Sequence, residues 1–428
     1  MMNSKIEKEL DKLLEAKVIS RSVQEDIKAY YAKDTVEKPN KLFAIFGVLG
    51  SLLTGLGIIL ILAHNWDDFS RATKTFWAFV PLVVGQLFAA YTLFKKRSSA
   101  WKETAAVFLF FAIGASMALV SQIYNIPGEM SSFLLTWIVL AAPLVYLLKS
   151  HAVALLHLLF ATIYACNVGC FNDTTPYLYL LLLGWLLPYY WMQLKSKPSS
   201  NITGIFNWFL PLSLLITLGA FVQWDDSFVF LTYIFLFGLF YNLGKLPFFE
   251  HQKMRANGYL LLGSLGTVFT LFITSFSFVW DEFINDFLSI NDTAVTIVIG
   301  LVTLAVIAFM YSKKRLRPFN LFQYVFVLFF GICLFKEGGS FVPTILVNIL
   351  ILALGVFAVE MGARKNLFSV LNYGLLIITG LITCRFFDTD ISFVLRGLLF
   401  VAIGAGFFGA NYFMYKKQQK QQKLTINE

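Results

Sequence analysis

The stretch 59-ILILAHNWDDFSRATK-74 decides the class of this protein, because a long apolar run ends abruptly in a tryptophan and two acids. The run that it closes covers residues 42–62, and similar runs recur as far as residue 415. A stretch of about 17–25 apolar residues can cross a hydrocarbon core of about 30 Å as a helix. The sequence therefore predicts an all-α, polytopic helical integral membrane protein.

Composition supports the same class, because 58% of the 428 residues are hydrophobic and only 14% are charged. An ordinary soluble domain carries about 25% charged residues. About fourteen spans are predicted, at 42–62, 76–94, 105–126, 132–148, 151–171, 177–194, 205–223, 228–244, 258–279, 293–312, 319–335, 341–360, 366–384 and 391–415. The runs 132–148 and 319–335 are short enough to be re-entrant or tightly packed segments, which leaves twelve to fourteen spans open.

The orientation follows from the lysines and arginines, which cytoplasmic loops of membrane proteins retain. With the N-terminus inside, most of the 34 Lys and Arg fall in inner segments, and the outer loops hold only Arg71, Lys74, Lys336 and Arg385. Both termini are therefore expected in the cytoplasm. The net charge of +9 is a signal of topology and not of nucleic-acid binding. A basic inner face also attracts anionic membrane lipids, which are expected partners.

Three regions are predicted: residues 1–41 form a cytoplasmic helical hairpin, residues 42–415 form the transmembrane domain, and residues 416–428 form a basic cytoplasmic tail. In the hairpin, the sequence from Ser22 to Glu25 is typical of a capping box that starts the second helix. About thirty residues bury little core alone, so the apolar stripe of the hairpin should pack on the membrane domain, on a second copy, or on a partner.

No motif of a soluble enzyme is present, and no catalytic residue, metal site or cofactor is expected. The four histidines are spread over both sides of the membrane, and only His157 lies well within a span. A lone histidine there is typical of a hydrogen-bonded packing residue. An intramembrane transferase is a third alternative, for which no acid, base and metal set converges.

Ionisable groups inside the bilayer are costly and therefore informative, and Arg396 is the clearest case. It lies six residues after Asp390, about 9 Å along a helix from the outer end. Arg396 either extends to the outer headgroups or turns inward to a polar partner at its depth. The candidate partners are Asn65, Asp67, Gln122 and Tyr124.

The Trp-Asp-acid pattern of the opening stretch occurs three times, at Trp66, Trp224 and Trp280. Each copy closes a predicted span at the outer interface, where an indole ring is comfortable among lipid headgroups. Trp224 and Trp280 are therefore interpreted as interface anchors. Trp66 is interpreted as part of a ligand-binding site, for the reason given next.

The sequences 55-GLGIILILAHNWDDF-69 and 118-ALVSQIYNIPG-128 resemble the bacterial predicted membrane proteins grouped as domain of unknown function 2157. The matching residues are Ala63, Asn65, Trp66, Gln122, Ile123 and Tyr124. The closing segment from Arg385 to Tyr412 also resembles long members of that family. The resemblance implies a bacterial cytoplasmic (inner) membrane protein, and it implies no activity.

Two functions are expected from these patterns. The first is a transporter-like or lipid/anion-handling protein with a polar pocket open to the outer face, lined by Asn65, Trp66, Asp67, Gln122, Tyr124 and Arg396. An arginine there would favour a carboxylate or phosphate. The alternative is a non-transporting scaffold or sensor that binds an envelope protein partner or self-associates through the N-terminal hairpin.

Overall fold

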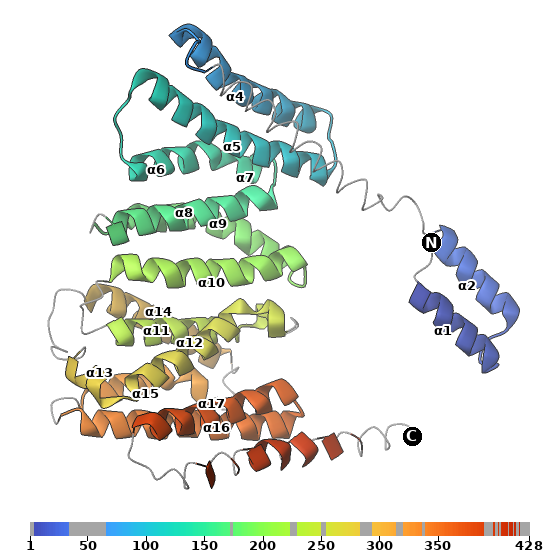
Figure 1. The fold of residues 1–428 in the computed structure, drawn as a ribbon. Coiled ribbons are helices and arrows are strands. Elements are labelled where there is room, and N and C mark those ends of the chain that lie inside the picture. Colours follow the sequence, from blue (N-terminus) through green and yellow to red (C-terminus); the bar gives the residue numbers. More distant parts are fainter. Residues whose placement is uncertain are drawn as a thin grey trace. The chain divides into compact units, whose positions relative to one another are not determined.

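The structure is a computed structural model that describes residues 4–33, 66–171, 174–222, 229–249, 254–282, 293–313, 320–335 and 339–388, with short pieces between 397 and 419. The chain divides into two units, Met1–Trp77 and Ala78–Glu428, and each unit is described by itself. All regular elements in the described ranges are α-helices or short 3₁₀ helices (Figure 1). The predicted all-α class is therefore confirmed for the part of the chain that the structure describes.

The first unit holds helices α1 (Ser4–Glu15) and α2 (Arg21–Lys33), which lie side by side in Figure 1. Leu10 is buried between them, and Gln24 Nε2 donates a hydrogen bond to Asp11 Oδ1 at 2.8 Å. The helix α2 begins at Arg21, and Ser20 Oγ accepts a hydrogen bond from Val23 N at 3.4 Å. The predicted capping box at Ser22 is therefore wrong by two residues, because Ser20 and not Ser22 accepts the hydrogen bond from a free N–H group of the first turn.

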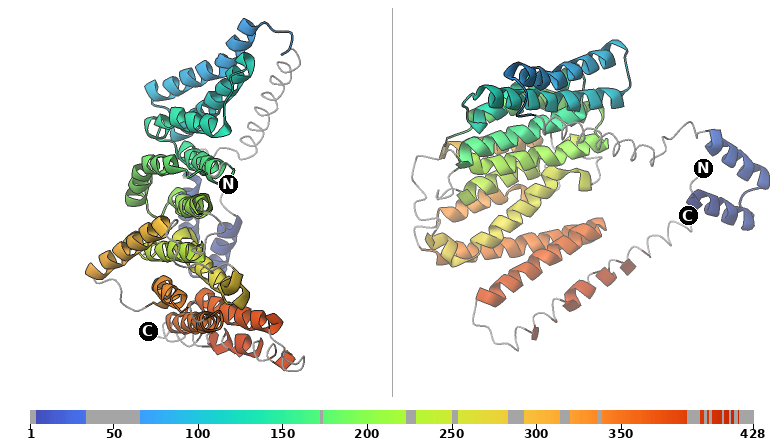
Figure 2. Two further views of the ribbon diagram at one scale, coloured as in Figure 1. Left: turned by 90° about the vertical axis from the view of Figure 1, so that its left-hand side faces the viewer. Right: turned by 45° about the horizontal axis from the view of Figure 1, so that its top comes forward.

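The second unit is a series of helices (Figures 1 and 2). The first half comprises α4 (Arg71–Phe94, which begins in the first unit), α5 (Ser99–Tyr124), α6 (Met130–Ala141), α7 (Pro143–Leu147), α8 (His151–Phe171), α9 (Tyr177–Ser196) and α10 (Asn201–Phe221). The second half comprises α11 (Val229–Leu243), α12 (Gly258–Thr274), α13 (Ser277–Glu282), α14 (Thr293–Ser312), α15 (Val325–Cys333), α16 (Phe341–Lys365) and α17 (Phe368–Asp388). The short 3₁₀ helices are η1 (Pro247–Phe249), η2 (Met254–Ala256) and η4 (Leu321–Gln323).

Eight helices in the described part of the chain are long and apolar enough to cross a membrane. They are Arg71–Phe94, Ser99–Tyr124, Met130–Leu147, His151–Phe171, Asn201–Phe221, Ala294–Ser312, Phe341–Lys365 and Phe368–Arg385. Large apolar side chains on these and neighbouring helices are exposed, such as Leu87 and Leu181, as expected for a surface that faces lipid. The chain is therefore a membrane protein. The number fourteen stays a prediction, because span 42–62 lies outside the described residues and span 391–415 is described only in pieces.

The two predicted spans that could be re-entrant or tightly packed, 132–148 and 319–335, are both interrupted. The span at 132–148 becomes α6 and α7, which are separated at Ala142 because Pro143 has no N–H to continue the helix. The span at 319–335 becomes a 3₁₀ turn, η4, followed by the nine-residue helix α15. The polar residues that surround this second interruption are central to the candidate site.

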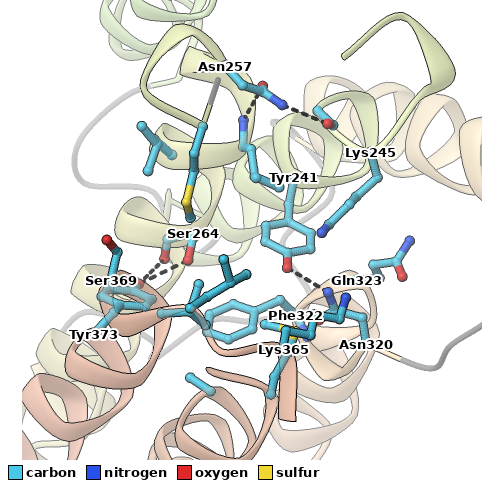
Figure 3. A pocket seen from close by; sticks show the side chains of 18 of the residues that line it. Tyr241, Lys245, Asn257, Ser264, Asn320, Phe322, Gln323, Lys365, Ser369 and Tyr373 are labelled. Atoms are coloured by element: carbon cyan, nitrogen blue, oxygen red, sulfur yellow. Dashed lines mark hydrogen bonds between the residues drawn. The ribbon is translucent and has the colours of Figure 1, made fainter. Parts of the chain in front are cut away.

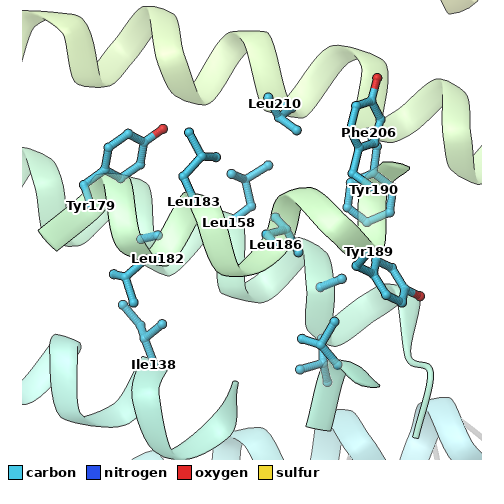
Figure 4. Packing of buried hydrophobic residues seen from close by; sticks show 14 of the residues in the cluster. Ile138, Leu158, Tyr179, Leu182, Leu183, Leu186, Tyr189, Tyr190, Phe206 and Leu210 are labelled. Carbon is cyan, nitrogen blue, oxygen red and sulfur yellow. The ribbon is translucent and has the colours of Figure 1, made fainter. Parts of the chain in front are cut away.

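Two buried clusters hold the helices of the second unit together. In the first, Leu186 of α9 is fully buried together with Leu158 of α8 and Phe206 of α10 (Figure 4). In the second, Phe329 of α15 and Trp280 of α13 are both fully buried, with ring centroids 6.0 Å apart. The predicted role of Trp280 as an interface anchor is therefore wrong. Its indole N–H donates to the carbonyl of Thr274 at 2.7 Å, which replaces the partner that a headgroup would supply. The matching residue Trp224 lies outside the described residues.

Glycines permit two close helix contacts that the sequence did not predict. A Cβ atom at Gly263 of α12 would lie 2.5 Å from the backbone N of Tyr241 in α11. A Cβ atom at Gly374 of α17 would lie 2.5 Å from the backbone N of Val359 in α16. Small residues of this kind allow membrane helices to approach closely. The pairs α11–α12 and α16–α17 are therefore packed backbone against backbone.

The start of α8 is fixed by an acid from α5. The Glu103 carboxylate accepts hydrogen bonds from the backbone N–H groups of His151 at 2.8 Å and Ala152 at 3.1 Å, and from Ser150 Oγ. A helix N-terminus leaves such N–H groups free and favours negative charge. Glu103 therefore acts as a cap supplied by a neighbouring helix.

Candidate functional site

The six residues of the predicted outer pocket are only partly described by the structure. Trp66 is half-buried, with its ring centroid 6.5 Å from that of Phe69, and Asp67 is exposed. Gln122 and Tyr124 are exposed at the end of α5. Asn65 and Arg396 lie outside the described residues. Trp66 and Asp67 belong to the first unit, and Gln122 and Tyr124 belong to the second, so the outer pocket stays a prediction.

His157 is a packing residue, as the sequence predicted. Its side chain is 1% exposed, and Nε2 forms a hydrogen bond with the carbonyl of Leu182 at 3.0 Å. In the part of the chain that the structure describes, no group of three or more His, Cys, Asp or Glu side chains could hold a metal ion.

A cavity of about 920 Å³ lies where several elements of the second unit meet (Figure 3). Most of its lining comes from the C-terminal ends of α11 and α16, the N-terminal parts of α12 and α17, and η4, and single residues of η1, η2 and α14 complete it. These contributions lie at the end of the helices that the charge pattern predicts to face the cytoplasm, which we call the inner end. We call this space the inner cavity.

One wall of the inner cavity is a set of paired amides and a phenol. Asn320 Nδ2 donates to Tyr241 OH at 2.7 Å, and Asn320 Oδ1 accepts from the backbone N of Phe322 at 3.1 Å. Next to this pair, Gln323 Nε2 donates to Asn242 Oδ1 at 3.1 Å. These amides satisfy the polar groups that are freed where the helical span is interrupted at η4, which explains how the interruption is tolerated.

The opposite wall joins α12 to α17. Ser264 Oγ donates to Tyr373 OH at 3.0 Å, and Tyr373 OH donates to the carbonyl of Ser264 at 3.1 Å. Between the two walls, the ring of Phe322 is stacked 5.4 Å from that of Tyr241 and 6.3 Å from that of Tyr373. The cavity therefore has a rigid aromatic floor flanked by hydrogen-bonding groups.

Three cations line the inner cavity, namely Lys245, Arg364 and Lys365. Arg364 is paired with the exposed Glu360 on the same helix, with Nη2 and Oε1 2.5 Å apart. Among the described residues, neither lysine forms a salt bridge, and Lys245 Nζ lies 5.5 Å from the centre of the Tyr241 ring. The cavity therefore carries an excess of positive charge.

Lys245 is the more confined of the two lysines, because it is half-buried whereas Lys365 is exposed. Burial lowers the pKa of the Lys245 ammonium, and the nearby charge of Lys365 lowers the pKa further. Both effects mean that the positive charge of Lys245 is unfavourable in the empty cavity. An anion placed between the lysines would oppose both effects, because an opposite charge favours the ammonium form.

The sequence contains weak signals for the inner cavity. These signals are missed when each span is considered by itself. Lys245 directly follows a predicted span, and Asn320 and Gln323 open the predicted span 319–335. Polar residues at the end of a span are also typical of ordinary loops. Only the packing of elements that are far apart in sequence makes a site of them.

The fold and the cavity define a multi-helical membrane protein with a cationic, aromatic-floored cavity at one end of its helices. Residues 11–154 match the family model described as "Predicted membrane protein (DUF2157)". This match confirms the resemblance seen around Asn65, Trp66, Gln122 and Tyr124, whereas the closing segment from Arg385 lies outside it. No curated protein and no solved structure matches the chain.

Proposed function

We propose that this membrane protein handles an anionic ligand, which it binds in the inner cavity through Lys245 and Lys365. The observation that carries the proposal is the presence of two lysines on one cavity with no salt-bridge partner among the described residues. A phosphate or carboxylate can accept charge-assisted hydrogen bonds from both ammonium groups.

The chemistry of the walls supports this choice of ligand. A charge that is partly removed from water is costly unless it is paired, so two neighbouring lysines favour a site that is completed by an anion. Tyr241, Asn320 and Ser264 supply hydrogen-bonding groups beside the charges, and the amides already pair with each other. The neutral polar groups therefore already have partners, and the anion would supply the missing charge.

This proposal keeps the lipid/anion-handling function expected from the sequence but places the ligand at the inner end. A second pocket at the outer face, with Arg396, stays a prediction, as do transport and a bacterial inner-membrane location with both termini in the cytoplasm. The alternative of a scaffold that binds an envelope protein partner or self-associates through α1 and α2 also stays a prediction. Deletion of residues 1–38 separates these functions, because anion binding in the inner cavity should survive it.

The direct test is titration of the purified full-length protein with inorganic phosphate and with glycerol 1-phosphate. We expect the substitution Lys245→Met to weaken binding of glycerol 1-phosphate about tenfold or more, because one charge-assisted interaction is lost. The matched control is Lys195→Met, which removes an exposed lysine at the inner end of α9, outside the cavity. Equal binding by the two variants, or no binding by the unmodified protein, would refute the proposal.

A further inference from the structure

We infer that the occupant of the inner cavity is an anionic membrane lipid, with its headgroup between Lys245 and Lys365 and an acyl chain in an adjoining apolar groove. This inference rests on the proposed function and names the class of its ligand. It is carried by a second cavity, which is lined almost entirely by apolar side chains.

The second cavity has a volume of about 460 Å³ and lies between α10, α11, α12 and α17. Apart from Gly266 and the phenol of Tyr373, its lining consists of leucine, isoleucine, valine and phenylalanine side chains. Leu265 and Tyr373 line both cavities. The inner cavity therefore adjoins this second space, which we call the apolar groove, at these two side chains.

The direction of the apolar groove matches that of a lipid in the inner leaflet. The helix α12 starts at Gly258 at the inner end, and the lining of the groove extends along it to Phe272. At about 1.5 Å per residue, Phe272 lies about 21 Å from the helix start, which is beyond the middle of a hydrocarbon core of about 30 Å. A lipid with its phosphate at the lysines would direct its acyl chain along this path.

The apolar groove is also accessible from the surrounding lipid. Its lining residues Phe269 and Leu376 have 67% and 63% of their surface exposed. These two side chains lie on α12 and α17. Nearer the inner end, the same two helices are joined by the hydrogen bonds between Ser264 and Tyr373. A lipid could therefore enter sideways from the bilayer. A small water-soluble anion has no acyl chain that could pack in the groove.

The two cavities should contribute differently to binding. An acyl chain gains little by leaving other acyl chains for an apolar groove, because lipid tails are as apolar as leucine side chains. Preference for one lipid over another should therefore come from the charge of the headgroup. The groove should contribute only by accommodating the shape of an acyl chain. The expected order is phosphatidylglycerol before phosphatidylcholine, with the preference reduced by salt.

The test compares a lipid with its soluble headgroup analogue. Binding of phosphatidylglycerol and phosphatidylcholine is measured by native mass spectrometry of the full-length protein, and binding of glycerol 1-phosphate by titration. The variant Leu376→Trp fills the apolar groove from an exposed position, and Leu181→Trp is the matched control on α9, where the leucine is 69% exposed. We expect Leu376→Trp to lower phosphatidylglycerol binding severalfold and to leave glycerol 1-phosphate binding unchanged.

The outcomes separate the two proposals. Retained binding of glycerol 1-phosphate by Leu376→Trp shows that this variant is folded. If the unmodified protein binds glycerol 1-phosphate but does not prefer phosphatidylglycerol, or if Leu376→Trp and Leu181→Trp bind that lipid equally, the lipid inference is wrong and the proposed function stands. If neither the lipid nor the soluble phosphate binds, both are wrong.

Discussion

Gln323 and Asn242 exchange two hydrogen bonds between η4 and α11. The Gln323 side chain donates to Asn242 Oδ1, the Asn242 side chain donates to the Gln323 carbonyl, and both distances are 3.1 Å. Both side chains are buried. This reciprocal pair holds the interrupted span against its neighbour and so fixes the wall of the inner cavity.

Replacement of either amide should leave its partner unsatisfied in the protein interior. We expect Asn242→Ala and Gln323→Ala each to lower the free energy of unfolding by about 1–2 kcal/mol. The double variant should lose less than the sum, because the partners depend on each other. Unfolding in mixed detergent micelles measures the three values. Fully additive losses would show that the two amides do not interact.

Gly263 of α12 should not tolerate a methyl group. The added Cβ of Gly263→Ala would collide with the backbone of Tyr241, so we expect a loss of about 1–3 kcal/mol in the free energy of unfolding. The control is Gly331→Ala in α15, where nothing lies within 4 Å of the new Cβ. Alanine favours a helix over glycine by up to about 1 kcal/mol, so this control should be neutral or stabilising. Equal effects of the two variants would contradict the close contact between α11 and α12.

Lys245 should give stability and anion binding opposite dependences on pH. Its pKa in the folded protein is lowered, first by burial and then by Lys365, whereas the unfolded chain keeps the ordinary value. Between these two values the unfolded chain binds more protons, so the ligand-free protein should gain stability as pH rises through this window. Binding of glycerol 1-phosphate should weaken over the same window, because Lys245 loses its charge.

The variant Lys245→Arg tests this explanation, because a guanidinium stays charged throughout that range of pH. Thermal unfolding and phosphate titration, repeated at rising pH, should show both trends in the unmodified protein and neither in the variant. Trends that persist in Lys245→Arg would assign them to another group.

Glu103 should stabilise the start of α8 mainly through its charge and its two acceptor oxygens. We expect Glu103→Ala to lower the free energy of unfolding by about 1–3 kcal/mol, and Glu103→Gln by less, because an amide keeps one acceptor. Glu360→Ala is a suitable control, since it removes an acid that is exposed and paired only within its own helix. A Glu103→Ala protein as stable as the control would argue against the cap.

The membrane class could be predicted because apolar run length reflects a property of single helices. The short apolar runs 132–148 and 319–335 signalled the interruptions at Pro143 and η4. The conformation of each interruption depends on the helices that pack around it. Trp280 shows the limit most clearly. Its flanking acids are typical of an interface, and the structure buries its ring against Phe329, which lies about fifty residues away in sequence. The inner cavity escaped prediction for the same reason, because Lys245 and Lys365 come together only through packing.

The nine residues of α15 have a consequence for the bilayer itself. The helix rises only about 14 Å, less than half of a typical hydrocarbon core. Val327, Leu328 and Phe330 on its exposed side are 41–46% accessible, so lipids beside them meet an apolar surface that is too short. Such a hydrophobic mismatch is relieved when the bilayer thins locally. The protein should therefore indent the membrane on this flank and favour bilayers made of shorter acyl chains.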